Sequence, residues 1–275
     1  MRSPSPTNSS ASFAFHASQT GSTFACRLDG GSFSGCASPA TYTGLANGSH
    51  TFDVRATDPA GNTDGSPASR TWTVDVSSSS IFSDGFESGD FSAAGWVVTT
   101  GGDGAAIVQS TTVKSGSFAA RLAETANTSS VAAARKNLGA SYADLSAAAD
   151  FQVQVEGASG GNIPLFRLYD AANVRLLTVY RQNLTNGQIW ASDGTNRWQS
   201  SALLALNSWG RLKAHVITAG TGASTVELWL GATKILTASN GNLGSSGVRS
   251  IQIGNDTSKQ AFTLVADDVL VTQGP

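Results

Sequence analysis

Apolar and polar residues alternate with a period of two through much of the chain, starting near Ser12. Because the side chains of a strand point alternately to the two faces of a sheet, each alternating set of apolar residues would lie on one face. In the first part of the chain these sets are Phe13 and Phe15, then Phe24, Cys26 and Leu28, then Phe52, Val54 and Ala56, then Trp72, Val74 and Val76. Turn sequences such as Asp29-Gly30-Gly31 and Asp64-Gly65 separate them. The pattern predicts a small β-sandwich over residues 9–76, after a Ser/Pro/Asn-rich linker at 1–8.

A second β pattern follows a Ser-rich link at residues 77–81 and fills residues 82–275. We expect strands at 118–122, 151–155, 165–169, 175–180, 187–191, 209–217, 225–230, 234–237, 250–253 and 262–272. So many strands in a domain of this length favour a jelly roll of two sheets. The Ala-rich segment 141–149 is expected to form a short helix or a loop. Trp96, Trp209 and Trp229 are expected in the core.

The charge of the chain excludes several classes of partner. Charged residues make up 13% of the chain, with 17 basic against 19 acidic, so no basic field is present to attract nucleic acid or an anionic membrane. The sequence contains no run of about 18 or more apolar residues, which is the length that a helix needs to cross a bilayer. The first residues lack the apolar core of a signal peptide. If the natural protein is exported, we therefore expect this chain to be a fragment of a longer polypeptide, located outside the cell or on its surface.

Cys26 and Cys36 are ten positions apart and flank a turn sequence, so they could meet. Two interpretations remain open at this point, a disulfide or a pair of buried free thiols. A bridge closing so short a loop would contribute about 2–3 kcal/mol, and it would persist only in an oxidising compartment.

The run from Phe24 to Asn62, with Cys26, Cys36, Tyr42 and Gly48 at their places in it, resembles the bacterial Ig-like repeats of large extracellular proteins. This resemblance covers nearly all of residues 9–76. It implies a disulfide between Cys26 and Cys36, a spacer role, and neighbouring domains in a longer chain.

The second part resembles the concanavalin A-like, or laminin-G-like, jelly-roll domains of bacterial secreted proteins. The matching segments are 84–92 with Trp96, 115–122, 207–213, 226–234 and 266–271. The two resemblances together imply an all-β chain, in which a small Ig-like β-sandwich is followed by a larger concanavalin A-like jelly-roll β-sandwich. The opening and closing segments also occur in carbohydrate-binding modules and in adhesion domains, so they specify the fold better than the ligand.

Four acidic residues are candidate ligands of a structural calcium ion. The second resemblance favours Glu87 with Asp267 or Asp268, and Asp84 next, because the first and last strands of such sandwiches are neighbours. Calcium takes six to eight oxygen ligands, and these carboxylates would supply part of that number. Asp267 and Asp268 would point to opposite faces of a strand, so only one of them is expected to bind. The alternative is a solvated acidic turn.

A candidate glycan-binding patch lies around one turn of the second part. Aromatic rings pack on the apolar faces of sugars, and polar side chains bind their hydroxyl groups. The candidates are Trp190, Asp193, Asn196, Arg197 and Trp198 around the turn, with Tyr180 and Arg181 on a nearby strand. The alternative is that Trp190 and Trp198 are core residues.

Recognisable catalytic motifs are missing from the sequence. The Glu-x-Asp-x-x-Glu signature of glucanases with this fold is absent, and Gln252-Ile253-Gly254 lacks the His of the Gln-Ile-His strand of lyases. We therefore predict that the chain is not an enzyme but a non-catalytic extracellular binding or adhesion module, with a polysaccharide or cell-surface glycan as ligand. The alternatives are a purely structural spacer or assembly unit, and a polysaccharide lyase or glycoside hydrolase.

Overall fold

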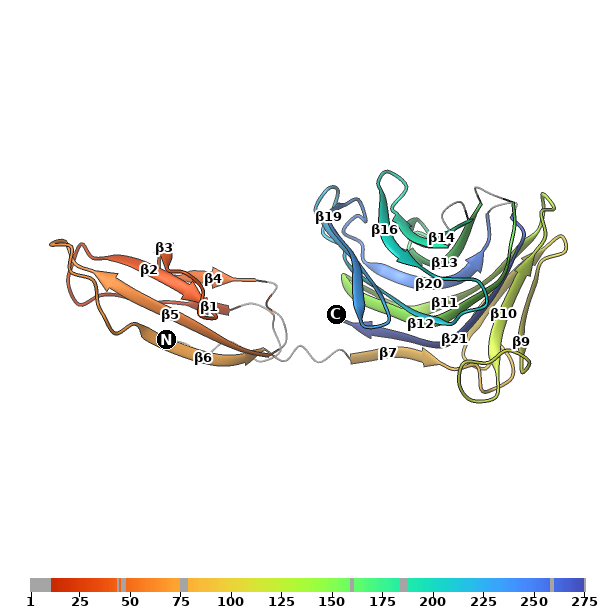
Figure 1. Cartoon of the computed structure of the whole chain (residues 1–275), viewed down its shortest axis with the longest axis horizontal. Coiled ribbons are helices and arrows are strands. Elements are labelled where there is room, and N and C mark those ends of the chain that lie inside the picture. Colours follow the sequence, from red (N-terminus) through yellow and green to blue (C-terminus); the bar gives the residue numbers. More distant parts are fainter. Residues whose placement is uncertain are drawn as a thin grey trace. The chain divides into compact units, whose positions relative to one another are not determined.

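The computed structural model describes residues 11–43, 45, 48–74, 79–158, 161–183, 187–257 and 260–274. The chain divides into two compact units, Met1–Ser77 and Ser78–Pro275 (Figure 1). Every element assigned to the described residues is a β-strand, which confirms the all-β prediction. Within this part of the chain, no helix has the length and hydropathy needed to cross a membrane. The predicted linker at 1–8 lies outside the described residues, and residues 79–81 of the predicted link 77–81 belong to a strand.

The first unit is built from two small sheets. A four-stranded sheet has the order β3-β2-β5-β6, and β1 pairs with β4. The bounds are β1 Ala11–Phe13, β2 Thr23–Leu28, β3 Ser34–Cys36, β4 Ala40–Tyr42, β5 Gly48–Thr57 and β6 Ala68–Val74. Phe13 and Phe52 are fully buried, and their rings stack with centroids 4.4 Å apart. The identification of this unit as an Ig-like repeat stays a prediction.

A disulfide joins Cys26 on β2 to Cys36 on the adjacent strand β3. Cys26 belongs to the buried core of the unit, together with Phe13, Phe52 and Val54. The disulfide prediction is therefore confirmed, and the alternative of free thiols is wrong.

The second unit is a sandwich of two large antiparallel sheets. The eight-stranded sheet has the order β19-β18-β17-β12-β21-β10-β9, with β7 also paired to β21, and the seven-stranded sheet has the order β16-β15-β14-β13-β20-β11-β8. The bounds are β7 Ser79–Asp84, β8 Trp96–Gly101, β9 Ala105–Gln109, β10 Ala119–Glu124, β11 Val131–Tyr142, β12 Asp144–Glu156, β13 Asn162–Tyr169, β14 Arg175–Gln182, β15 Gln188–Ser192, β16 Arg197–Leu203, β17 Gly210–Ile217, β18 Ser224–Leu230, β19 Thr233–Gly241, β20 Val248–Asn255 and β21 Phe262–Gln273. Both sheets curve in the same sense, and the seven-stranded sheet is the inner one, so its free face is concave (Figure 1).

One continuous apolar core fills the space between the two sheets. Phe151 on β12 and Phe166 on β13 meet edge to face across it, with ring centroids 4.9 Å apart. The segment 141–149, expected as a helix or loop, is instead the end of β11 and the start of β12. Pairing of β12 with both β17 and β21 overrides the helix propensity of its alanines, which leave room for close packing on both faces.

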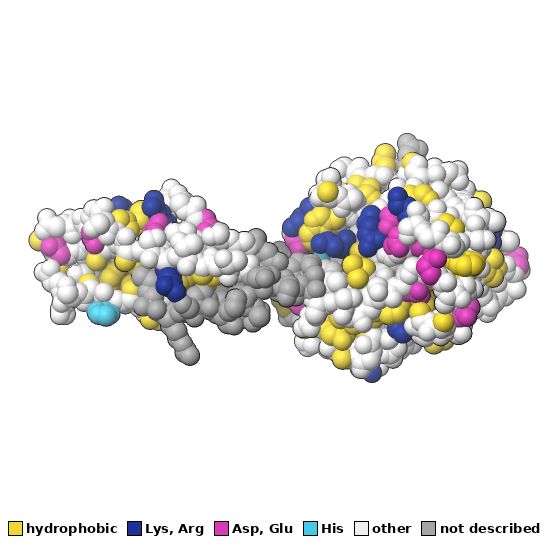
Figure 2. All heavy atoms as spheres, turned by 90° about the horizontal axis from the view of Figure 1, so that it is seen from below, with side chains coloured by type: hydrophobic (Ala, Val, Ile, Leu, Met, Phe, Trp, Pro, Cys, Tyr) yellow, Lys and Arg dark blue, Asp and Glu magenta, His cyan; other side chains and the backbone are white. Residues whose placement is uncertain are grey.

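The three tryptophans expected in the core differ in position. Trp96 is buried, whereas Trp209 is only half-buried. Trp229 lies on the outer face of the eight-stranded sheet, where the ammonium groups of Lys213 and Lys234 lie over its ring at 3.9 and 4.9 Å from the centroid. Figure 2, a space-filling view from below, shows basic, acidic and apolar side chains intermixed on the visible face of the second unit. Trp229 is therefore outside the core because Leu228, its neighbour on β18, takes the inward position.

Candidate functional site

A row of directly paired residues crosses the seven-stranded sheet from edge to edge. Because paired residues on neighbouring strands share a face, these side chains all belong to the concave face. The row runs Val97, Arg135, Gln252, Arg167, Thr178, Ser192 and Arg197, on β8, β11, β20, β13, β14, β15 and β16. A nearly neutral chain thus places several arginines along one line of one sheet.

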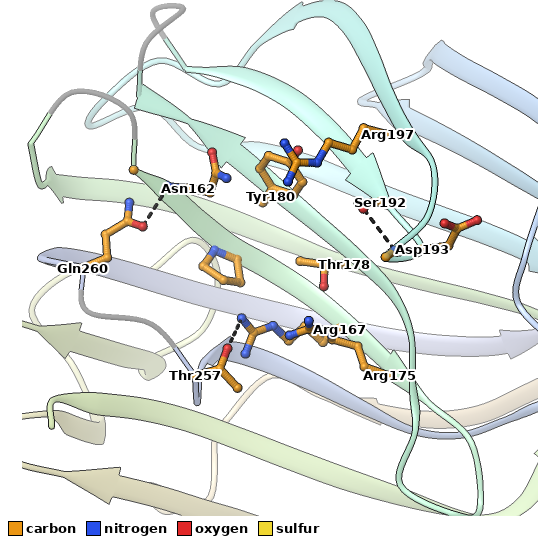
Figure 3. A pocket seen from close by; sticks show the side chains of 13 residues that line it. Asn162, Arg167, Arg175, Thr178, Tyr180, Ser192, Asp193, Arg197, Thr257 and Gln260 are labelled. Atoms are coloured by element: carbon orange, nitrogen blue, oxygen red, sulfur yellow. Dashed lines mark hydrogen bonds between the residues drawn. The ribbon is translucent and has the colours of Figure 1, made fainter. Parts of the chain in front are cut away.

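A hollow on this face has a volume of about 500 Å³. We call it the arginine hollow, and its lining side chains are Asn162, Pro164, Arg167, Arg175, Thr178, Tyr180, Ser192, Asp193, Arg197, Thr257 and Gln260. Figure 3 shows Tyr180 and Arg197 on one side of it and Arg167 and Arg175 on the other, with Thr178 between them. Two glycines, Gly161 and Gly194, complete the lining.

Arg167 forms part of the floor of the arginine hollow. Its side chain is only 4% exposed, and it forms an ion pair with Asp256 through Nη1. Nη2 donates hydrogen bonds of 2.9 Å to Asn255 Oδ1 and to Thr257 Oγ1. Its Nε has no hydrogen-bond partner among the described residues. Arg167 is thus held rigidly by partners on both of its terminal nitrogens.

Tyr180 is the titratable hydroxyl of the arginine hollow. Burial raises the pKa of Tyr180 above its usual value, and the positive charge of Arg197 opposes that increase. Its ring stacks on Trp190 of β15, with centroids 6.4 Å apart. The stack fixes the ring beside the guanidinium of Arg197.

Asp193 is the one carboxylate among the described lining residues. Its Oδ1 accepts hydrogen bonds from the backbone N–H groups of Thr195 and Asn196, and its Oδ2 accepts from Asn196 Nδ2 and from Asn242 N at 2.7 Å. Burial raises the pKa of Asp193, but these hydrogen bonds outweigh it and hold the pKa below its usual value. Asp193 therefore acts as the acceptor that shapes a turn.

The predicted glycan patch is brought together only in part. Tyr180, Asp193 and Arg197 line the arginine hollow. Arg181 lies on the opposite face of β14, because adjacent strand residues point to opposite sides; it is buried, pairs with Glu156 and donates to Leu204 O at 2.7 Å. Its inclusion in the patch was wrong.

The other members of the predicted patch have structural contacts. Asn196 donates to Asp193 and to Asn240 O, within the turn and across to β19. Trp198 packs partly against the core, and its Nε1 donates to Asn240 Oδ1 at 3.3 Å. Trp190 supports Tyr180, and its buried Nε1 has no partner among the described residues. Neither tryptophan lines the arginine hollow.

The sequence interpretation missed Arg167, Arg175 and the residues that follow β20. One signal could have found Arg167, since it is the single charged residue in the otherwise apolar run 165–169. Thr257 and Gln260 carry no such signal, because only the pairing of β13 with β20 brings them to the hollow.

The segment Gln252-Ile253-Gly254 lies on β20. Gln252 accepts hydrogen bonds from Arg135 Nε at 3.0 Å and Nη2 at 2.7 Å. Gly254 has φ of +77°, and a Cβ there would lie 2.4 Å from Ala132 O. The position that carries His in the lyase pattern therefore has no room for any side chain in this chain.

The four predicted calcium ligands lie where β7 pairs with β21, so the first and last strands of the unit are neighbours as expected. The Glu87 carboxylate accepts from the N–H groups of Ser117 and Phe118, and Asp84 accepts from Phe86 N and Trp96 Nε1. Asp267 accepts from Lys114 N and Ser115 N, and Asp268 accepts from Ser115 Oγ. Asp267 is fully buried, whereas Asp268, which adopts a left-handed φ of 49°, borders a surface hollow.

The donor set at this corner fits calcium only in part. Glu87, Asp84 and Asp268 border one shallow surface hollow. Within the described ranges, no group of three or more acidic, His or Cys side chains is close enough to hold a metal ion. Backbone carbonyls would have to supply several oxygens. A structural calcium ion stays a prediction.

Calcium addition tests this prediction. If the ion binds the folded unit, saturating calcium is expected to raise the Tm of the second unit by about 5–10 °C relative to excess chelator, measured by differential scanning calorimetry. Glu87→Gln should remove the difference. Equal Tm values for the wild-type chain in calcium and in chelator would show that no ion binds there.

Comparison with known proteins places the fold of the second unit. No protein-family model and no curated protein matches the chain. Similar solved structures include an endo-β-1,4-glucuronan lyase from the fungus Trichoderma reesei (TM-score 0.57, 13% identity, 71% of this chain and 96% of that chain) and a cellulose-induced protein, Cip1 (TM-score 0.56, 15% identity, 69% and 96%). A carbohydrate esterase from the Shiga toxin-encoding bacteriophage phi24B is also similar (TM-score 0.55, 15% identity, 72% and 100%).

These similarities correct one prediction and refine another. Two of the three proteins are named as enzymes, so the prediction that the chain is not an enzyme is contradicted. At such low identity the likeness shows the fold alone. The chain carries a jelly-roll β-sandwich of the kind found in carbohydrate-active proteins.

Proposed function

We propose that the second unit is a polysaccharide lyase that cleaves a uronic acid-containing polysaccharide in the arginine hollow. The observation that carries this proposal is Tyr180 beside Arg197, with Arg167 and Arg175 in the same hollow and no pair of carboxylates there among the described residues. A guanidinium group matches the geometry of a carboxylate, which is the group that distinguishes a uronate from a neutral sugar. The fold similarity to a glucuronan lyase supports the same class of substrate.

Tyr180 would perform the proton transfers of a β-elimination. Arginine contacts to the uronate carboxylate make the C5 proton more acidic, because they stabilise the negative charge that develops as it leaves. Tyr180, as phenolate, takes that proton. The C5–H electron pair forms the C4–C5 double bond, the bond from C4 to the glycosidic oxygen breaks, and Tyr180 returns the proton to this oxygen.

The hollow does not suit the two other reactions of carbohydrate-active proteins on such folds. Glycoside hydrolysis uses two carboxylates. Asp193 is the one carboxylate among the described lining residues, and both of its oxygens accept hydrogen bonds from backbone N–H groups. Ester hydrolysis by serine needs an adjacent base. Ser192 Oγ instead donates to Asn196 O at 2.8 Å, and His215 lies in the other sheet, bound to Asp144 and Glu227.

A second hollow on the same face supports a polymeric substrate. It has a volume of about 440 Å³ and includes Val97, Arg135, Asn173 and Arg249. Arg135 belongs to the row that crosses the sheet, three strands from Thr178, or about 14 Å at the usual strand spacing. An anionic polysaccharide lying across the sheet would contact arginines in both hollows, which favours cleavage within a chain.

An extracellular location is part of the proposal. The disulfide between Cys26 and Cys36 is of the kind that persists in oxidising compartments, and polysaccharides of this type lie outside cells. The first unit would serve as an Ig-like spacer that connects the lyase to neighbouring domains.

A product assay tests the proposed function directly. The full chain is incubated with glucuronan, alginate, pectate and, for comparison, neutral cellulose and arabinan. The C4–C5 double bond conjugated with the carboxylate should appear by ultraviolet absorbance with at least one polyuronate and with neither neutral polymer. Absence of unsaturated product from every polyuronate would sink the proposal.

Arg197→Ala tests recognition of the substrate carboxylate. Loss of one charge-assisted contact of about 1.5–3 kcal/mol is expected to lower kcat/KM by about 10- to 150-fold on a polyuronate. Measured on the methyl-esterified form of the same polymer, the loss should be at most about threefold. An equal decrease in kcat/KM on both substrates would show that Arg197 does not recognise the substrate carboxylate.

A further inference from the structure

A chain of hydrogen bonds connects the floor of the arginine hollow with a carboxylate in the protein core. Arg167 Nη2 donates to Asn255 Oδ1 at 2.9 Å, and Asn255 Nδ2 donates to Glu124 Oε2 at 3.0 Å. Glu124 Oε1 accepts from the N–H of Ala132 at 2.7 Å. Arg167 is 4% exposed, Glu124 is 5% exposed and Asn255 is fully buried. The connection therefore runs through the interior, away from solvent.

Glu124 reaches this position because of strand alternation. It ends β10 of the eight-stranded sheet and points to the same side as Ala120 and Leu122, which lie in the core between the sheets. Asn255 ends β20 of the seven-stranded sheet. A carboxylate of one sheet thus meets an amide of the other directly behind the hollow.

We propose that Glu124 is a positioning residue of the site: as a carboxylate it holds the Asn255 amide with its oxygen toward Arg167, and as a carboxylic acid it releases that orientation. The consequence for catalysis rests on the proposed function, because it requires that Arg167 contributes to substrate binding. The hydrogen-bond relay from Glu124 through Asn255 to Arg167 does not depend on the proposed function.

The relay follows from the numbers of donors and acceptors. Each oxygen of the ionised Glu124 faces an N–H donor, so a proton on Oε2 would point at the Asn255 amide nitrogen. If the Asn255 amide rotates by 180° so that its oxygen accepts that proton, its NH₂ group faces Arg167 Nη2. Two N–H donors then face each other, and the hydrogen bond between Arg167 and Asn255 is lost. Asn255 Oδ1 also accepts from Thr257 N at 3.3 Å, so the same turn loosens a second lining residue.

Both protonation states of Glu124 are accessible near neutral pH. Burial raises the pKa of Glu124 to about 7, although the hydrogen bonds from Asn255 and Ala132 and the charge of Arg167 lower it. Asp256 also raises it. Of the groups that face Glu124 from the neighbouring strands, Arg167 and Asp256 carry the charges, and Ala132 contributes a backbone donor only.

Nuclear magnetic resonance tests the relay without any substrate. The side-chain amide of Asn255 and the Nε–H of Arg167 are followed between about pH 5.5 and 8.5, a range that brackets the pKa of Glu124. Both signals are expected to shift with one midpoint near pH 7 in the wild-type chain, and with no such midpoint in Glu124→Gln. Wild-type signals that do not titrate, or that titrate equally in the variant, would overturn the proposal.

A second variant covers the case in which Glu124→Gln does not fold. Asn255→Ala keeps the carboxylate but removes the connection, so the Arg167 Nε–H should no longer respond to it. A persistent response of Arg167 with the same midpoint would contradict the relay. Glu156→Gln is the matched control, because Glu156 binds the buried Arg181, which does not line the hollow; the response of Arg167 should be unchanged there.

Kinetics on a cleaved polyuronate provides the functional readout. KM of the wild-type chain is expected to rise as pH falls through 7, by up to about tenfold per pH unit below the midpoint, in addition to the fall in kcat that protonation of Tyr180 causes in every variant. Glu124→Gln should have a raised KM at every pH, and Glu156→Gln should follow the wild-type profile. A chain that cleaves no polyuronate would refute the proposed function and leave the magnetic resonance result to decide the relay.

Discussion

Replacing Tyr180 by Phe is expected to lower kcat on a polyuronate by about 10²- to 10⁴-fold, the usual contribution of a positioned acid–base group, with little change in KM. The substitution removes one oxygen atom and keeps the ring that stacks on Trp190, so the hollow should retain its shape. The loss would therefore report proton transfer. Initial rates of unsaturated product formation, with Tm as a check on folding, measure it.

Tyr169→Phe is the matched control. Tyr169 lies on the same face, where its ring contacts the Arg135 guanidinium at 3.7 Å, but it does not line the arginine hollow. We expect it to keep most of the activity. A variant pair with the opposite behaviour, inactive at 169 and active at 180, would show that the base was assigned to the wrong tyrosine.

The pH dependence of kcat follows from the same residue. Burial raises the pKa of Tyr180 above its usual value, with the charge of Arg197 opposing, and only the phenolate can take the C5 proton. The active fraction is therefore small at neutral pH and grows about tenfold per pH unit until the pKa is reached. We expect kcat to rise through the alkaline range. A kcat that falls above pH 8 would argue for another base.

The fold was accessible from the sequence wherever side chains alternate strictly. Phe52 and Val54 of β5 and Leu228 beside Trp229 of β18 show the pattern that a half-buried strand requires. The prediction failed where the cause of strand formation lies elsewhere in the chain. The Ala-rich start of β12 is a strand because two neighbours pair with it, and β8 and β9 are Thr/Gly- and Ala-rich edge strands with a weak pattern of their own.

The candidate site was less accessible, for a related reason. Tyr180, Asp193 and Arg197 are near in sequence and could be grouped by their turn. Arg167 and Thr257 are 90 positions apart and meet only through the register of β13 with β20. The prediction that the chain is not an enzyme relied on motifs within single strands, whereas the chemistry proposed here is spread across several strands.

Gly254 occupies the position that carries His in the Gln-Ile-His pattern of lyases. Its replacement should strongly destabilise the second unit. Gly254→Ala is expected to lower the free energy of unfolding by about 3–5 kcal/mol, from a strained positive φ together with overlap of the new Cβ with Ala132 O at 2.4 Å. Chemical denaturation measures the change.

Gly220→Ala separates the two causes, because Gly220 has φ of +99° but no atom within 4 Å of a Cβ placed there. That variant should lose only the strain contribution, about 1–2 kcal/mol. The difference between the two variants then measures the close approach of β20 to β11 at Ala132. Since Ala132 also donates its N–H to Glu124, this contact fixes the backbone on which the Glu124 carboxylate rests. An equal loss of unfolding free energy in the two variants would mean that β11 can move away from Gly254. The contact between β20 and β11 at Ala132 would then not fix the backbone beside Glu124.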